Sequence, residues 1–203
     1  MTSTVIIGLS GSLNRPSRTR ALVETAVSRA ASRIKARSVV VDLLDLGPDL
    51  GTARRLSDLS AVARGTVDAI IGADALVVAS PVYKGSYTGL FKHLIDLIDP
   101  LALVGKPVLL AATGGGDRHA LVVEHQLRPL FAFFEAATLA TGIYASEKEI
   151  DYDGTVSPGL SDRLDRAVAQ FEPHLGARAT EPRSPRTLPP ARSSEPIAAA
   201  ASA

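Results

Sequence analysis

The chain has 203 residues, of which 46% are hydrophobic and 21% charged, with no cysteine and no tryptophan. This composition suits a globular domain, excludes disulfides and cysteine-based metal sites, and at a net charge of +1 offers no basic stripe for nucleic acid. No apolar run approaches the roughly 20 residues of a membrane span and the first eight residues lack a secretory signal, so we expect a cytoplasmic protein without a membrane partner.

Strand-like and helix-like patterns alternate along the chain. Short runs of β-branched and aliphatic residues that end in polar, glycine or proline residues indicate buried parallel strands. They lie at residues 5–9, 38–43, 75–79, 107–112 and 138–144. Apolar residues recur at helical spacing over residues 18–35, 57–71, 87–98, 119–136 and 160–174. This order predicts an α/β domain, a flavodoxin-like three-layer sandwich with a five-stranded parallel sheet in the order 2-1-3-4-5.

The composition changes near the C-terminus. Residues 179–203 contain five prolines together with serine, alanine and scattered arginine. Such a segment has too few apolar side chains to build a core. We therefore expect one domain over residues 1–177 and a disordered Pro/Ala/Ser-rich tail over residues 178–203.

The loop after the first strand has the residues of an anion site. In open α/β sheets, ligands bind beyond the carboxyl ends of the strands. Residues 10–20 carry hydroxyls and arginines into a helix N-terminus, which suits a phosphate monoester but also suits a plain helix cap. The loop matches neither GxxxxGK[ST] nor GxGxxG, which excludes a P-loop. Without that glycine pattern, we expect Asp42 at the end of the second strand to be a cap or turn residue rather than a ribose ligand.

Two more loops follow strand ends. Residues 80–89 combine proline, glycine and tyrosine, which suits the edge of a flat ligand or, alternatively, a turn with a helix cap. Residues 112–119 contain three consecutive glycines, which let the backbone approach a ligand closely or simply form a flexible turn. Taken together, the three loops predict an FMN site at a flavodoxin-type switch point.

These residues also resemble a known family, the NAD(P)H-dependent FMN reductases of two-component sulfonate monooxygenase systems, and most closely its methanesulfonate-associated branch. The likeness spans about residues 4–175 and rests on residues 15–19, 77–92, 112–119 and 124–130. It implies that the FMN phosphate is held by Ser10, Ser12, Ser17, Arg18 and Thr19. It implies that the flavin ring and ribityl chain are lined by Pro81, Val82, Tyr83 and Lys84. The isoalloxazine edge would face Thr113, Gly114, Gly115 and Gly116.

The resemblance also implies an irregular fourth helix. Family members carry a one-residue π-type insertion there, at an oligomer interface, and His125 occupies that position in this chain. Pro129 supports the irregularity, because a proline inside a helix removes a backbone hydrogen bond. The alternative is that His125 is an ordinary surface or core histidine. By resemblance we expect a homodimer or homotetramer.

The function implied by the resemblance is hydride transfer from NADH or NADPH to FMN, with reduced FMN supplied to a partner flavin-dependent monooxygenase of sulfonate metabolism. The cofactors supply the chemistry, so we expect neither a metal nor a catalytic side chain. One alternative is a self-contained FMN-dependent reductase of quinones, azo dyes or metal ions. Another is a flavodoxin-like carrier, although flavodoxins are usually strongly acidic. NADH and NADPH are not distinguished, because Arg15, Arg20, Arg118 and Arg128 could each meet a 2′-phosphate or solvent.

Overall fold

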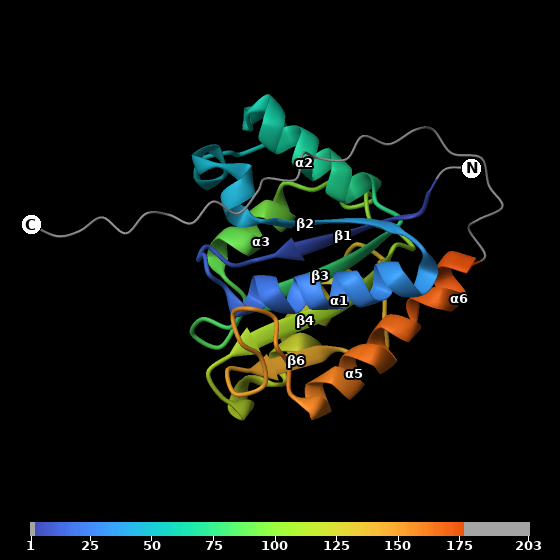
Figure 1. Ribbon diagram of the computed structural model, residues 1–203. Helices are drawn as coiled ribbons and strands as arrows, with labels where there is room; N and C mark the ends of the chain where they lie inside the picture. Colours follow the sequence, from blue (N-terminus) through green and yellow to red (C-terminus); the bar gives the residue numbers. More distant parts are fainter. Residues whose placement is uncertain (1–2, 177–203) are drawn as a thin grey trace, which may run out of the picture.

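The protein is described here by a computed structural model, which covers residues 3–176. A parallel sheet lies at the centre with helices on both faces (Figure 1). Its strands are β1 (Val5–Ser10), β2 (Arg37–Asp42), β3 (Ala75–Pro81), β4 (Pro107–Gly114), β5 (Ala137–Thr138) and β6 (Ile143–Ser146). The order β2-β1-β3-β4-β5, with β6 as an additional strand on β4, confirms the predicted flavodoxin-like fold. The predicted tail, residues 178–203, lies outside the described residues.

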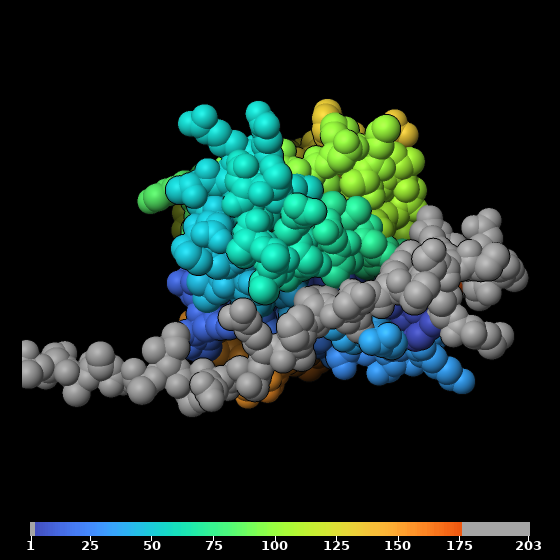
Figure 2. Space-filling view, turned by 90° about the horizontal axis from the view of Figure 1, so that it is seen from above, coloured from blue at the N-terminus to red at the C-terminus, as the bar shows by residue number. Residues whose placement is uncertain are grey.

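Helices cover the sheet in two layers. They are α1 (Arg18–Ile34), α2 (Ala61–Gly72), α3 (Gly89–Asp96), α4 (Arg128–Ala132), α5 (Pro158–Ala169) and α6 (Phe171–Gly176). One layer contains α1, α5 and α6, and the other contains α2, α3 and α4. Three 3-10 turns, η1 (Leu43–Leu46), η2 (Pro48–Gly51) and η3 (Leu56–Asp58), join β2 to α2. With α2 they form the cyan and teal part of the surface in Figure 2.

Because helices cover both faces of the sheet, its strands are apolar along most of their length. Ile6 and Val77 pack towards α1 and α5, whereas their neighbours Ile7 and Val78 pack towards α2 and α3. Successive side chains of a strand point to opposite faces of a sheet, so strands covered on both sides need apolar residues at every position. The polar residues are left to the strand ends, where the sheet borders its loops.

The predicted fifth strand, residues 138–144, is wrong as a single element. The structure divides it into β5 and β6, and both pair with β4. In the gap, the Gln170 side chain accepts from the Thr141 backbone N–H at 3.1 Å and donates to the Thr141 hydroxyl at 2.6 Å. Arg128 donates to the Leu139 carbonyl at 2.9 Å. Because side chains take these backbone groups, the strand ladder is interrupted.

The predicted helix over residues 119–136 is also irregular. It is replaced by a 3-10 turn η4 (Asp117–His119), a π-helix η5 (Val123–Leu127) and the short α4. The Arg128 N–H closes the wide turn on the Val123 carbonyl. Pro129 has no N–H to offer the carbonyl four residues earlier, which belongs to His125, and this favours the irregular backbone.

Three other predicted helices have shifted boundaries. The helix predicted over residues 87–98 is shorter at both ends, since α3 spans Gly89–Asp96. The helix predicted from residue 57 begins at Ala61, because the Ser60 hydroxyl caps it by accepting from the Ala63 N–H at 3.3 Å. The helix predicted over residues 160–174 is divided at Gln170, whose side chain binds Thr141.

Candidate functional site

A cleft of about 210 Å³ opens where the carboxyl ends of the strands meet. The register places Pro81 beside Thr113 and Gly114 beside Ser146, so the loops after β3, β4 and β6 emerge together. The cleft is lined by Ser12, Asn14, Pro16, Ser17, Arg18, Thr19, Pro81, Val82, Tyr83, Thr113, Gly114, Gly115, Glu147 and Tyr152. The structure therefore brings together four loops that are distant in sequence, those after β1, β3, β4 and β6.

Three residues of the predicted FMN set do not line the cleft. Ser10 is fully buried at the end of β1, and its hydroxyl lies 3.4 Å from the Ser12 N–H. Lys84 is exposed at the tip of a tight turn. Gly116 lies one residue past the lining, and its carbonyl accepts a hydrogen bond from Tyr144.

The N-terminus of α1 forms the polar end of the cleft. Ser17 is the N-cap, and its hydroxyl accepts from the Arg20 N–H at 3.2 Å. The N–H groups of a first helical turn have no acceptor within the helix, which leaves those of Arg18 and Thr19 for a ligand. The Ser12 and Thr19 hydroxyls lie beside them. Such a set of N–H and hydroxyl donors at a positive helix end suits a phosphate monoester.

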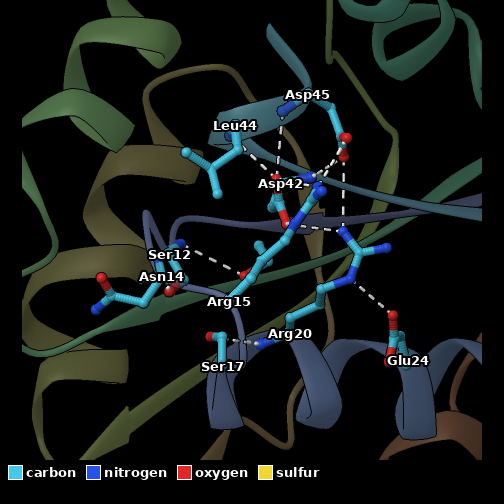
Figure 3. A network of polar contacts seen from close by, with 10 residues as sticks. Ser12, Asn14, Arg15, Ser17, Arg20, Glu24, Asp42, Leu44 and Asp45 are labelled. Atoms are coloured by element: carbon cyan, nitrogen blue, oxygen red, sulfur yellow. Dashed lines mark hydrogen bonds and ion pairs between the residues drawn. The ribbon is translucent and has the colours of Figure 1, made fainter. Parts of the chain in front are cut away.

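A buried carboxylate anchors the loop that leads into α1 (Figure 3). Asp42 is 1% exposed and accepts two hydrogen bonds of 2.8 Å from the Arg15 guanidinium. Arg20, in the first turn of α1, donates a third of 2.8 Å. Asp42 also accepts from the backbone N–H groups of Leu44 and Asp45, so it caps η1 as the sequence predicted.

Asp45 completes this network. Its carboxylate accepts from the Asp42 N–H at 2.9 Å and from Arg15 at 2.8 Å. Burial opposes the charge, but these hydrogen bonds and the two arginines hold the pKa of Asp45 below its ordinary value. The hydrogen bond to Asp42 raises the pKa of Arg15. Arg15 and Arg20 are thus paired with acidic groups, and neither lines the cleft.

Arg18 points in a different direction. Its Nε donates to the Ile150 carbonyl at 3.1 Å, and its guanidinium lies 4.2 Å from the centre of the Tyr152 ring. The Tyr152 hydroxyl accepts from Arg18 at 3.2 Å. Arg18 and Tyr152 together form one wall of the cleft. The hairpin that carries Tyr152 closes through the bridge between Ile150 and Val156.

A tight turn forms another part of the cleft lining. Tyr83 and Ser86 exchange backbone hydrogen bonds of 2.9 and 3.2 Å around Lys84 and Gly85, whose φ angles are 52° and 85°. Two positive φ values are typical of a type I′ turn, in which glycine is favoured at the second central position. The turn presents the half-exposed Tyr83 ring at the cleft, and its hydroxyl accepts from the Asn14 amide at 3.1 Å.

The glycines after β4 have different roles. A Cβ at Gly114 would lie 2.5 Å from the Tyr144 hydroxyl, whereas a Cβ at Gly115 would meet nothing within 4 Å. The Tyr144 hydroxyl donates to the Gly116 carbonyl at 2.6 Å, and burial raises the pKa of Tyr144, which keeps this donor protonated. Gly114 is therefore required by packing, and Gly115 leaves backbone open to the cleft.

Sequence reasoning missed four lining residues, namely Asn14, Pro16, Glu147 and Tyr152. Asn14 and Pro16 lie inside the loop predicted over residues 10–20, so their position in the sequence was enough to include them. Glu147 and Tyr152 follow β6, and their sequence carries no glycine-rich or hydroxyl-rich pattern. Only the pairing of β6 with β4 brings them to the cleft.

The remaining sequence candidates lie apart from the cleft. His125 is exposed within the π-helix η5. Arg128 pairs with Glu124, and Arg118 is exposed with no side-chain partner among residues 3–176. Within the same range, no group of three or more histidine, cysteine or acidic side chains is arranged to hold a metal ion. No helix in the described part of the chain is long and apolar enough to cross a membrane.

The cleft fits the two halves of FMN by its chemistry. A phosphate monoester suits the hydroxyl and N–H donors at α1, and a planar ring suits the exposed backbone at Gly115 and the turn that carries Tyr83. The family model for NADPH-dependent FMN reductases matches residues 4–151. The chain belongs to this FMN reductase family. It is an oxidoreductase of FMN with NADH or NADPH as the electron donor.

Known FMN reductases resemble the chain over most of its length. An "FMN reductase (NADPH)" of Pseudomonas aeruginosa is 46% identical over 86% of this chain and 94% of its own length. The "NADH-dependent FMN reductase SfnF" of Pseudomonas fluorescens is 47% identical over 84% and 93%. The apo structure of an NADH:FMN oxidoreductase, EMOB, superposes with a TM-score of 0.71 at 31% identity, covering 94% of this chain and 97% of that one.

Proposed function

We propose that this FMN reductase releases its reduced flavin to a partner flavin-dependent monooxygenase of sulfonate metabolism. The observation that carries the release step is the pairing of Arg15 and Arg20 with Asp42 and Asp45, which leaves the polar end of the cleft without either cation. Arg18 is then the one cation among the described residues that line the cleft, beside N–H and hydroxyl donors, and a phosphate held in this way is bound less strongly than one held by several arginine forks. The sulfonate assignment is supported by the resemblance of residues 77–92, 112–119 and 124–130 to reductases of sulfonate monooxygenase systems.

The residues proposed to hold FMN fall into three groups. Ser12, Ser17 and Thr19 bind the phosphate together with the first N–H groups of α1, and Arg18 closes that end of the cleft with Tyr152. Residues 81–83 line the ring and the ribityl chain, and residues 113–115 border the ring edge. Bound FMN supplies the group that accepts the hydride, and the chain supplies position and electrostatics. A nicotinamide nucleotide is consumed, so the proposed location is the cytoplasm.

The proposed assembly is a homodimer or homotetramer built on the π-helix. The outer side of this segment carries His125, and Leu121 and Phe133 near its two ends are 64% and 68% exposed. Large exposed apolar side chains on one helical segment are typical of a protein interface. Light scattering on the wild type and on Phe133→Ser tests this assignment, and a wild-type monomer at micromolar concentration would overturn it.

The first experiment is a flavin titration of flavin-stripped protein, with oxidation of NADH and of NADPH followed by the loss of nucleotide absorbance. We expect saturable turnover with FMN in excess of enzyme, with FMN preferred over riboflavin because only FMN carries the phosphate. A partner monooxygenase then has to use the reduced flavin in a coupled assay. Quinone reduction without added FMN would instead favour a self-contained flavoenzyme, and FMN binding without nucleotide oxidation would favour a carrier.

A further inference from the structure

We propose that Asp42 is a positioning residue that holds the phosphate loop, residues 12–19, in its binding shape through Arg15 and Arg20. The proposal rests on the proposed binding of the FMN phosphate by this loop. It concerns a residue outside the cleft, since Asp42 is buried at the end of β2 and does not line it.

The two arginines bracket the cleft-lining part of the loop. Arg15 immediately precedes residues 16–19, all of which line the cleft, and Arg20 immediately follows them. Both guanidinium groups end on the same carboxylate of Asp42, with hydrogen bonds of 2.8 Å (Figure 3). The four bracketed residues therefore cannot move relative to β2 without breaking charge-assisted hydrogen bonds.

The surroundings of Asp42 make these bonds strong. Asp42 has a side chain only 1% exposed, while those of Arg15 and Arg20 are 35% and 23% exposed. A buried carboxylate has no water to replace a missing hydrogen-bond donor, so the loss of such a donor costs more free energy than it would at the surface. A loop held in this way is already ordered before the ligand arrives, which lowers the entropic cost of binding.

The contribution of Asp42 is one of shape rather than charge. The positive charges of Arg15 and Arg20 are balanced by the negative charges of Asp42 and Asp45. The network as a whole therefore presents no net cation to a phosphate. If Asp42 acts by ordering the loop, its loss weakens the binding of flavins that carry the phosphate and leaves riboflavin unaffected.

The test is Asp42→Asn, measured by quenching of flavin fluorescence with FMN and with riboflavin. The asparagine carbonyl still accepts from the backbone of η1, so the cap is retained while the charge is removed. We expect the FMN Kd to rise about tenfold and the riboflavin Kd to change by less than about twofold. Arg15→Gln, at a more exposed position, is expected to act in the same direction, and it decides the matter if Asp42→Asn does not fold.

The matched control is Glu24→Gln, which removes the exposed partner of Arg20 and leaves Asp42 intact; both Kd values are expected to stay unchanged. Equal weakening of FMN and riboflavin would show a general structural role and overturn the proposal. Tighter FMN binding would also overturn it, because the phosphate would then gain more from the released arginines than it loses with the order of the loop. These titrations measure binding and need no turnover. A wild type that binds FMN but oxidises no nucleotide would therefore contradict the proposed function and leave the role of Asp42 testable.

Discussion

Thr19 and Thr113 meet through their side chains, with 2.6 Å between their two Oγ1 atoms. Both residues are buried, and both line the cleft. The contact joins the first turn of α1 to the end of β4, so it ties the proposed phosphate end of the site to the proposed ring edge. This hydroxyl pair holds together two loops that are 94 residues apart in sequence.

Removing one of these hydroxyls leaves the other without its hydrogen-bond partner. Thr19→Val or Thr113→Val alone is expected to lower the free energy of unfolding by about 1–2 kcal/mol, because a buried hydroxyl loses its partner. The double variant is expected to cost less than the sum of the two. Urea unfolding measures all three, with the exposed Thr52→Val as a control. A double variant whose cost equals the sum would show that the hydroxyls do not interact.

Gly114 and Gly115 make a matched pair. Gly114→Ala is expected to lower the free energy of unfolding by about 1–3 kcal/mol, because the new methyl group overlaps the Tyr144 hydroxyl. Adding Tyr144→Phe removes the overlapping atom and is expected to restore part of that loss. Gly115→Ala meets nothing in the protein and is expected to leave stability unchanged while weakening FMN binding. Thermal unfolding and flavin titration separate the two effects, and equal destabilisation by both alanines would contradict this account.

Asp45 is expected to contribute to stability against acid. Its folded pKa is lower than its ordinary value of 3.8, so the unfolded chain binds the proton more readily. The contribution is therefore complete above the unfolded pKa and is lost as pH falls through the folded one. Asp45→Asn should destabilise the protein near neutral pH and flatten the fall of the melting temperature below about pH 4. The exposed Asp68→Asn serves as control, and parallel melting curves for Asp45→Asn and wild type would refute the expectation.

Tyr152 is expected to act on flavin affinity through Arg18. Tyr152→Ala removes both the ring beneath the guanidinium and the hydroxyl that accepts from it, so Arg18 retains its hydrogen bond to the Ile150 carbonyl but is held less firmly. We expect the FMN KM to rise about threefold to tenfold, the size of a lost cation–π contact with its hydrogen bond. Tyr152→Phe keeps the ring and should stay close to wild type. Tighter FMN binding by Tyr152→Ala would contradict this expectation, because it would show that Tyr152 keeps Arg18 away from the phosphate.

Local patterns were sufficient to predict the framework. The apolar runs of the first four strands, a helix cap within residues 10–20 and the turn role of Asp42 depend on residues close in sequence, and the structure has all three, with Ser17 as the cap. The sheet order followed because right-handed crossovers leave few alternatives. The three predicted loops line one cleft for the same reason, since parallel strands end at the same edge.

Contacts between distant residues explain what the sequence did not predict. The interruption between β5 and β6 depends on Gln170, which lies 29 residues from its partner Thr141. The pairing of Arg15 with Asp42 spans 27 residues, so the arginine could not be distinguished from a free cation. Tyr152 lies in a hairpin that the Asp153-Gly154 pair signals in the sequence, but only the pairing of β6 with β4 brings that hairpin to the cleft.

The network around Asp42 also constrains how this protein can change. One carboxylate holds the loop before α1, the first turn of α1 and the turn η1, so a substitution there alters three segments at once. Effects of changes at residues 15, 20, 42 and 45 will therefore be strongly non-additive. Efforts to alter flavin preference should vary these four positions together as one library, because each single change removes only some of the ion pairs and leaves the remaining partners to rearrange.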